Sequence, residues 1–480
     1  MIKRATVLWI LLDVAVLIIM GVLLFWGAAW RPDAQRANSE SWQVFRPYTD
    51  VAKYQCYVAA FMHGLPGLKP FSPEQCSFIT NPDPSIKYIN QTQILTEMQK
   101  YHLPGALIQL VQKQNPNEPL HSLPREYPLL TLVPFSLSAI GPGNMYQVRY
   151  AFLMELVVAI TYILLACFRS RKAAIVAVLY IVAGGWATAA GRFDLVPAFL
   201  TLVALIFATR KHWNWAFAFL ALATMAKYYP AILLIPFLLA QQFAISERWY
   251  AWRRWLPLAV YVVICGVLTC ISLLLSVEGT LGTLSYFSNR PVQVESMASS
   301  LIWVASHFGF PIQGFEKTYG SLNVFSPLSK DVSLLASVGF AAGILYTYWL
   351  QWRRKIDLGL SCVLILLIVL LTGKVFSPQY LLWVAPLVAF VGEADWRWLL
   401  SWGLISLLTT WDYPIIYDMV KVLDQVPYLS LFYPVVTIRN LLLLGLVVVL
   451  LCIATFRRRI VTHEPVVVEP GPSPVALAQQ

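Results

Sequence analysis

The chain alternates between long apolar runs and short polar connections. Several of the runs reach the roughly 18 residues that a helix needs to cross the hydrocarbon of a bilayer. The short alternating segments of an outer-membrane barrel do not describe this pattern. It predicts an all-α polytopic membrane protein with about 12 transmembrane helices. The predicted helices occupy approximately residues 6–30, 147–168, 173–190, 195–209, 256–275, 332–351, 358–373, 381–392, 398–411 and a last run ending at Arg457, with two more inside 215–243.

The run 215–243 is interrupted by Lys227-Tyr-Tyr-Pro230. A proline removes a backbone donor and clashes with the preceding helical turn, so it favours a break there. Basic residues flank the run on both sides, at Arg210-Lys211 and Arg253-Arg254. Because Lys and Arg concentrate on the cytoplasmic side of a membrane, both flanks are expected to lie there. The run is therefore predicted to be a hairpin of two short helices, with Lys227 at its outer tip.

The same rule orients the whole chain. Basic clusters follow the predicted helices at 169–172, 353–355 and 457–459. With these clusters inside, both termini are predicted to be cytoplasmic in a multi-pass protein of the plasma membrane. The first apolar run is too long for a cleaved signal peptide, so it is expected to be a retained helix. Residues 1–460 are predicted to form a single transmembrane domain, and 461–480 a disordered cytoplasmic tail.

Three polar stretches interrupt the helices on the opposite side of the membrane. Residues 31–146 are predicted to be a large first extracytoplasmic loop and 276–330 a second outer loop. A third covers 412–433. Apolar positions at helical spacing within 294–308 predict an interfacial helix. Cys56 and Cys76 share the first loop and could form a disulfide in an oxidising compartment. Spacing alone leaves their pairing open.

Composition agrees with a membrane protein, since 58% of the 480 residues are hydrophobic and only 12% are charged. The formal net charge of +11 would suit a nucleic-acid partner. The basic residues, however, form short clusters between apolar runs, which is the orientation signal of a membrane protein. Nucleic-acid binding is therefore not expected.

The candidate chemistry lies on the predicted outer side. Ionisable groups near the bilayer are costly unless they face water or protein, so they indicate a functional site. Four cations from separate segments would suit a phosphate anion. The charged candidates are Asp50, Glu126, Arg192, Asp194, Lys227, Arg290, Glu295 and Lys374.

Each candidate also has a plainer interpretation. Asp50 could cap a helix, and Arg192 could pair with Asp194 at a helix end. Lys227 could extend its amine to the interface. Arg290 and Glu295 could be ordinary charges of an interfacial helix, and the nearby tyrosines could belong to an aromatic belt.

Six motifs, in this order, resemble membrane glycosyltransferases of the C superfamily, and specifically glycosyltransferase family 87. That family includes polyprenyl-phosphate-mannose-dependent mannosyltransferases. The resemblance covers roughly residues 1–400. The motifs are Tyr-Thr-Asp50, Glu126-Tyr127-Pro128, Gly191-Arg192-Phe193-Asp194, Ala226-Lys227-Tyr228-Tyr229-Pro230, Arg290-Pro-Val-Gln293-Val-Glu295-Ser296 and Phe376-Ser377-Pro378-Gln379-Tyr380.

The resemblance implies an inverting transferase on the extracytoplasmic face. It would move one sugar, mannose by family analogy, from a polyprenyl-phosphate donor to a lipid-linked or glycan acceptor. Asp50 would be the general base. The donor phosphate would be bound by Lys227, Arg290, Lys374 and Arg192. The sugar or acceptor would be bound by Glu126, Tyr127, Asp194, Tyr228, Gln293, Glu295, Ser377, Gln379 and Tyr380.

No metal or other cofactor is expected. The chain has neither a His-x-x-x-His pair nor a CxxC pair, and Asp50 is not followed by a second acid as in metal-assisted members of the superfamily. Two alternatives remain open. A transporter or lipid flippase would fit the number of helices, although the related halves common in transporters are not visible. A polymerase or ligase of lipid-linked saccharides would share the outer-face chemistry.

Overall fold

The computed structural model describes residues 4–29, 50–82, 86 and 89–457. The predicted tail 461–480 and the beginning of the first loop, 31–49, lie outside the described residues.

Within the described part of the chain, five helices are long and apolar enough to cross a membrane. Much of their surface is exposed and apolar; Val262, Val263 and Leu274, for example, all lie exposed on one of them. Such a surface suits contact with lipid. The multi-pass membrane character predicted from the sequence agrees with these helices. The five are α1 (Arg4–Ala29), α7 (Tyr146–Phe168), α12 (Trp252–Leu275), α15 (Ser329–Trp352) and α19 (Phe432–Phe456).

Shorter helices stand at the remaining seven predicted positions. Short polar side chains set the beginning of some of them: the Asp357 carboxylate accepts a hydrogen bond from the Leu360 backbone N–H at 2.8 Å. Twelve crossings remain a prediction. The shorter helices are α8 (Arg171–Gly185), α9 (Leu195–Thr209), α10 (Trp213–Ala226), α11 (Leu234–Ala244), α16 (Leu358–Thr372), α17 (Leu381–Gly392) and α18 (Trp396–Thr410).

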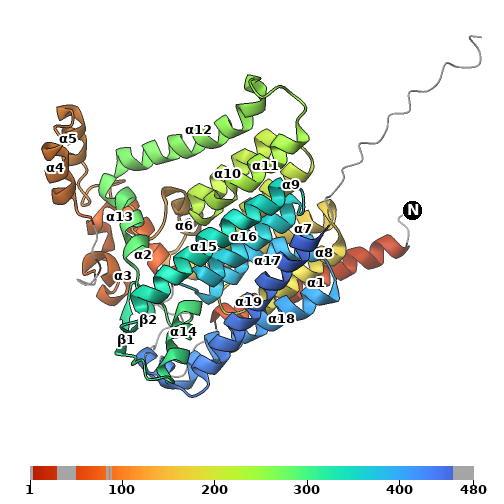
Figure 1. Ribbon diagram of the computed structural model, residues 1–480. Coiled ribbons are helices and arrows are strands. Elements are labelled where there is room, and N and C mark those ends of the chain that lie inside the picture. Colours follow the sequence, from red (N-terminus) through yellow and green to blue (C-terminus); the bar gives the residue numbers. More distant parts are fainter. Residues whose placement is uncertain (1–3, 30–49, 83–85, 87–88, 458–480) are drawn as a thin grey trace, which may run out of the picture.

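The core of the bundle lies around α16 and α17, whose side chains are almost all buried. In Figure 1 most of the bundle helices run side by side, and α12 lies along one margin. The predicted break between α10 and α11 is confirmed. Lys227 is extended (φ −157°, ψ 131°) and ends α10. A short 3-10 turn, Tyr229–Leu233, then follows before α11, with Pro230 as its second residue.

The polar stretches fold into short elements that gather at one end of the bundle, at the left in Figure 1. The interfacial helix predicted within 294–308 corresponds to α14. The elements are α2 (Asp50–His63), α3 (Pro73–Thr80), α4 (Gln91–Lys100), α5 (Gly105–Gln112), α6 (Leu132–Ser138), α13 (Val277–Asn289) and α14 (Met297–Ser306).

The fold is predominantly helical, as predicted, and it also contains a small β-hairpin that the sequence did not predict. Strands β1 (Gly314–Thr318) and β2 (Ser321–Phe325) are antiparallel. Tyr319 and Gly320 connect them with φ of 52° and 66°. Two positive φ angles are typical of the tight turn that matches the twist of a hairpin. Residues 292–294 lie along β2, since Val294 N–H donates to the Leu322 carbonyl at 3.1 Å and Val324 N–H to the Val292 carbonyl at 2.9 Å.

A separate hydrophobic cluster supports this end of the molecule. It joins Val294, β2 and α14 to the segment after α18 and the first turns of α19, through residues such as Val324, Ile302, Ile416 and Phe432. The segment 292–294 is therefore held from two sides, by the hairpin and by the end of the bundle.

Candidate active site

A cavity of about 500 Å³ lies at the end of the bundle where the short elements gather. Its lining comes from segments far apart in the sequence, including α2, the connection before α6, the loop 290–295, the hairpin, and the segments before α17 and after α18. Eleven of the residues singled out from the sequence line it. They are Asp50, Glu126, Tyr127, Arg192, Lys227, Arg290, Gln293, Glu295, Ser377, Gln379 and Tyr380.

Asp50 is the first residue of α2. A carboxylate is favoured there because the first N–H groups of a helix carry partial positive charge. Its side chain forms an ion pair with Arg192, and Lys53 Nζ lies 3.8 Å from its Oδ1. Arg192 therefore pairs with Asp50 rather than with Asp194, the plainer partner considered from the sequence. The Asp50 side chain is 19% exposed, so it remains accessible from the cavity.

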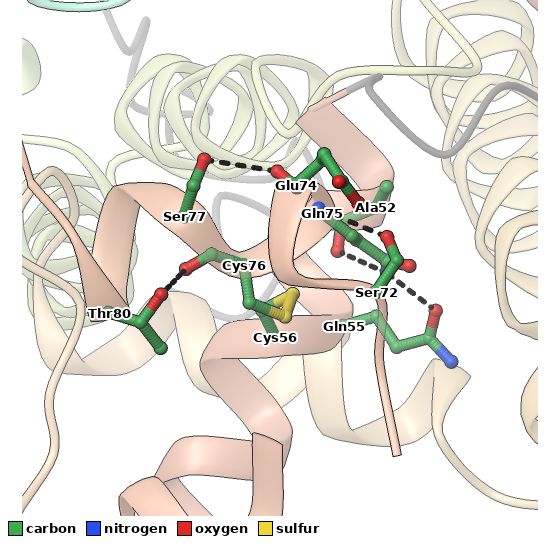
Figure 2. The surroundings of a disulfide bond; sticks show 9 residues. All are labelled: Ala52, Gln55, Cys56, Ser72, Glu74, Gln75, Cys76, Ser77 and Thr80. Carbon is green, nitrogen blue, oxygen red and sulfur yellow. Dashed lines mark hydrogen bonds between the residues drawn. A yellow bond between two sulfur atoms is a disulfide. The ribbon is translucent and has the colours of Figure 1, made fainter. Parts of the chain in front are cut away.

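A disulfide anchors the helix that carries Asp50. Cys56 of α2 is bonded to Cys76 of α3, which answers the pairing left open by the sequence. Figure 2 shows the surroundings of this bond. Gln75 also donates from Nε2 to the Ala52 carbonyl at 3.2 Å, so α3 contacts α2 close to Asp50. Gln75 itself lines the cavity.

Lys227 is buried, with 9% of the residue exposed. Its Nζ lies 2.5 Å from Asp194 Oδ1, which also accepts a hydrogen bond from Trp383 Nε1. The amine stands 5.0 Å from the ring centre of Trp383 and 5.3 Å from that of Tyr380. Such ring faces attract a cation. Lys227 therefore occupies a fixed position inside the protein rather than extending to a membrane interface.

Arg290 approaches the cavity from the end of α13. Its Nη2 donates to Ser321 Oγ at 3.0 Å and to the Tyr319 carbonyl at 3.4 Å, so the hairpin turn holds one side of the guanidinium. Tyr286 lies under the guanidinium, with its ring centre 5.3 Å from Cζ. The Nε–H is buried and has no hydrogen-bond partner among the described residues. This donor is available for an anion.

Glu295 and Gln293 form a polar wall of the cavity next to strand β2 of the hairpin. Glu295 Oε1 accepts from Tyr417 O–H at 2.8 Å, and Oε2 accepts from Gln293 Nε2. The Gln293 Oε1 atom is buried without a partner among the described residues. Burial, and then the nearby Asp412 carboxylate, raise the pKa of Glu295 above its ordinary value. Uncharged hydroxyl groups, as in a sugar, suit such a wall.

Four further predicted residues of the lining, Tyr127, Ser377, Gln379 and Tyr380, are aromatic or polar. Ser377 Oγ donates to Gln379 Oε1 at 2.5 Å. The ring of Tyr380 stacks on Trp383 at 4.0 Å between centres, and Tyr229 stacks on Trp383 at 4.1 Å. Tyr127 packs edge-on against Tyr54, with 5.7 Å between ring centres. Stacked rings beside hydrogen-bonding groups give the cavity both apolar and polar surfaces, as a sugar requires.

Three predicted site residues do not line the cavity. Lys374 is exposed, and its backbone carbonyl accepts a hydrogen bond from the Gln293 N–H at 2.9 Å. Asp194 lies behind Lys227 as its ion-pair partner. Tyr228 precedes the 3-10 turn next to Lys227. The cavity lining therefore contains three of the four cations predicted to bind phosphate.

Sequence reasoning missed several residues at the site. Lys53, Lys317 and Lys421 also line the cavity, but lysines in polar loops are too common to stand out. Arg439 and Asp412, both fully buried, form an ion pair of 3.0 Å beside the lining. Their signal was available, because an arginine inside a membrane-length apolar run is rare and indicates a buried partner.

Among the described residues, no group of three or more His, Cys, Asp or Glu side chains is arranged to hold a metal ion. A metal-independent site remains a prediction.

A scan against models of protein families and a search of curated proteins found no match. Among solved structures, the chain is similar to ArnT from Cupriavidus metallidurans, a crystal structure bound to undecaprenyl phosphate. The two chains share 15% sequence identity and a TM-score of 0.32, over 69% of this chain and 68% of the other. The resemblance to glycosyltransferase family 87 therefore rests on the sequence motifs alone.

Proposed function

We propose that this chain is an inverting glycosyltransferase that moves one sugar from a polyprenyl-phosphate donor to a lipid-linked or glycan acceptor. One observation carries the proposal: the carboxylate of Asp50 and the cations Arg192, Lys227 and Arg290 line the same cavity. A base and a set of cations are the two groups that this displacement needs. Mannose is the sugar that the motif resemblance implies.

In the proposed reaction, Asp50 removes the proton from an acceptor hydroxyl as its oxygen attacks the anomeric carbon. A carbon–oxygen bond forms on one face of the sugar while the bond to phosphate breaks on the other. The proton stays on Asp50, and polyprenyl phosphate leaves with the electron pair. Base assistance of this kind accelerates a reaction by roughly 10²–10⁴-fold.

The cations would stabilise the negative charge that grows on the leaving phosphate. Arg290 offers a buried Nε–H for this purpose. Arg192 is paired with Asp50 in the structure. A donor phosphate would compete for Arg192 and leave the Asp50 carboxylate free to accept a proton. Gln293, Glu295, Gln379 and Tyr380 would hydrogen-bond sugar hydroxyls.

The site is proposed to lie on the extracytoplasmic face of the plasma membrane, with both termini in the cytoplasm. The disulfide supports this side, because such bonds persist in oxidising compartments. It belongs to the same end of the bundle as the cavity, since Asp50 and Cys56 share α2. The donor lipid chain would lie along the apolar bundle surface.

The proposal is tested by Asp50→Asn in protein reconstituted with polyprenyl-phosphate mannose and a membrane lipid extract. Because the amide cannot accept the proton, we expect sugar transfer to fall by about 10²-fold or more, with donor binding and folding unchanged. The measurement is incorporation of labelled sugar into lipid.

Asp331→Asn is a matched control, since Asp331 also lies in the first turn of a helix, α15, but not in the cavity lining. It should transfer sugar normally. If Asp50→Asn keeps more than about a tenth of the activity, another residue is the base. If the wild-type protein incorporates no sugar from polyprenyl-phosphate donors, the transferase proposal itself fails and transport becomes the better explanation.

A further inference from the structure

Arg439 lies in the first half of α19 and is fully buried. Its guanidinium donates to Oδ1 of the adjacent Asn440, from Nε at 3.2 Å and from Nη2 at 3.1 Å, and it has three neighbours outside α19. Nη1 contacts Asp412 Oδ2 at 3.0 Å, Nη2 donates to the backbone carbonyl of Glu295 at 2.5 Å, and Cζ stands 4.2 Å from the ring centre of Phe376. These neighbours come from three separate segments of the chain.

Each of these neighbours either lines the cavity or directly precedes, along the chain, residues that line it. Glu295 is itself a lining residue, as is Gln293. Phe376 directly precedes the lining residues 377–380, and Asp412 directly precedes Tyr413 and the lining residues that follow it. One guanidinium therefore contacts three segments that contribute residues to the cavity lining. Arg439 itself does not line the cavity.

The Glu295 carbonyl is held particularly firmly. Asn440, the next residue of α19, donates from Nδ2 to the same carbonyl at 3.2 Å and to Ser300 Oγ at 2.8 Å. Two donors from one helix thus fix the backbone at Glu295. The direction of the Glu295 and Gln293 side chains follows from that backbone position.

Stability is a weak explanation for this arrangement. Burying two charges costs several kcal/mol per ion, and apolar residues of similar volume often stabilise a protein equally well. The surroundings are already apolar, because Val294, Ile416 and Val436 pack in the same hydrophobic cluster. What an apolar replacement could not supply is the fork of N–H donors directed at the Asp412 carboxylate and the Glu295 carbonyl.

We propose that Arg439 is a positioning residue that sets the geometry of the cavity wall formed by Gln293–Glu295, Ser377–Tyr380 and Tyr413–Tyr417, which faces the sugar. The catalytic meaning of this wall rests on the proposed transferase function. Arg439 acts through Glu295, Phe376 and Asp412 and does not touch substrate.

The first test is Arg439→Lys, which keeps the positive charge but removes the planar set of N–H donors that binds the Asp412 carboxylate and the Glu295 carbonyl. A displacement of about 1 Å in a substrate-contacting group can cost about 10²-fold in rate. We expect kcat/KM for sugar transfer to fall by a factor on the order of 10–100. The KM for the sugar donor should rise, because the affected wall contacts the sugar. Initial rates are measured with the donor concentration varied in one series and the acceptor concentration in another. The two series distinguish a change in the donor KM from a change in kcat.

Arg149→Lys is the matched control. Arg149 likewise donates to two backbone carbonyls, those of Ser138 at 2.9 Å and Pro142 at 2.8 Å, but it does not line the cavity or contact its wall. It should leave kcat and KM within about twofold of wild type. If Arg439→Lys matches this control, the positioning role is wrong.

A second measurement does not depend on activity. Amide hydrogen exchange should become faster in segments 292–296, 375–380 and 412–417 of Arg439→Lys, while α2, which carries the base, keeps its protection. Equal acceleration in α2 would show general destabilisation and overturn the proposal. A wild-type protein without transferase activity would refute the proposed function, yet this exchange pattern would still decide whether Arg439 holds the three segments.

Since Arg439→Lys could leave Asp412 poorly paired, a double variant keeps the test decisive. Arg439→Met with Asp412→Leu removes both buried charges and is expected to fold. It also removes the fork, so the positioning role predicts a loss of kcat/KM on the order of 10–100-fold here too. Wild-type kinetics in the double variant would show that the pair only balances its own charges.

Discussion

At the scale of single residues, the three cavity cations that are proposed to bind the donor phosphate differ in how they are already held. Lys227 is fixed by Asp194 and by two aromatic rings, and Arg192 by Asp50. Arg290 keeps one buried N–H without a partner among the described residues. An anion would thus meet Arg290 without breaking an existing ion pair, whereas contact with Arg192 requires an exchange of partners. Of the three, Arg290 is therefore the best prepared for the proposed binding of the donor phosphate.

Glu295 gives the site a pH dependence of known sign. Its pKa is raised from the ordinary 4.5 by burial and then by Asp412, so the folded protein binds a proton more tightly than the unfolded chain. The contribution of Glu295 to the free energy of unfolding is therefore fully present below about pH 4.5. It is lost as the pH rises through the raised pKa of the folded protein.

We therefore expect the thermal unfolding midpoint of the wild-type protein to decrease as the pH is raised from about 5 to about 8. Glu295→Gln, which mimics the protonated acid, should reduce that decrease. Thermal unfolding in detergent across this range provides the measurement. Identical slopes in the two proteins would contradict the assignment.

At the scale of elements, α2 and α3 form a disulfide-bonded unit that carries Asp50, the proposed base. The disulfide closes a segment with a sequence separation of 20 between its cysteines, and both cysteines are buried. Closing a loop of this length stabilises a fold by about 3 kcal/mol, chiefly by restricting the unfolded chain. The position of Asp50 depends on this unit, because the residue is the first of α2.

Replacing both cysteines by alanine should lower the free energy of unfolding by about 3 kcal/mol. It should also reduce sugar transfer, because α2 loses its covalent anchor. Thermal unfolding and transfer assays measure the two effects. Cys452→Ala removes an exposed free cysteine instead and should change neither. Equal behaviour of the two variants would show that the bond does not support the site.

The elements also show what sequence could and could not predict. The bundle helices followed from apolar runs, and the break at Lys227 followed from Pro230, because both signals are local. The hairpin was not anticipated, since its strands are stabilised by residues 292–294, which are remote along the chain. The convergence of Asp50, Arg290 and Glu295 had been expected from predicted topology. Which cations reach the cavity depended on side-chain placement, and Lys374 does not reach it.

At the scale of the whole molecule, the two ends of the bundle differ in chemistry. The cavity, the hairpin and the disulfide-bonded helices lie at one end. At the other, Arg169 pairs with Glu393 at 2.9 Å, joining the ends of α7 and α17. Lys355 donates to the Thr455 carbonyl at 3.1 Å, joining the ends of α15 and α19. Basic residues thus mark the end predicted to be cytoplasmic.

Orientation is tested by single-cysteine variants in a background whose five free cysteines are alanine. A membrane-impermeant maleimide should label Lys100→Cys, in the exposed helix α4, on intact cells. Arg353→Cys, beyond the end of α15, should be labelled only after the membrane is permeabilised. The reverse pattern would place the cavity on the cytoplasmic side and exclude an extracytoplasmic transferase.

The two sides of the cavity rest on different hydrophobic cores. Val51 and Tyr54 of α2 pack into the main core of the bundle, whereas Val292, Val294 and β2 pack into the cluster at the start of α19. Changes in one core need not disturb the other. Over evolution, such a chain could acquire new substrate preferences by altering the hairpin side while α2 and its acid stayed in place. If the chain has the proposed transferase function, the same division makes residues 314–325 a natural region for exchanging substrate specificity between related chains.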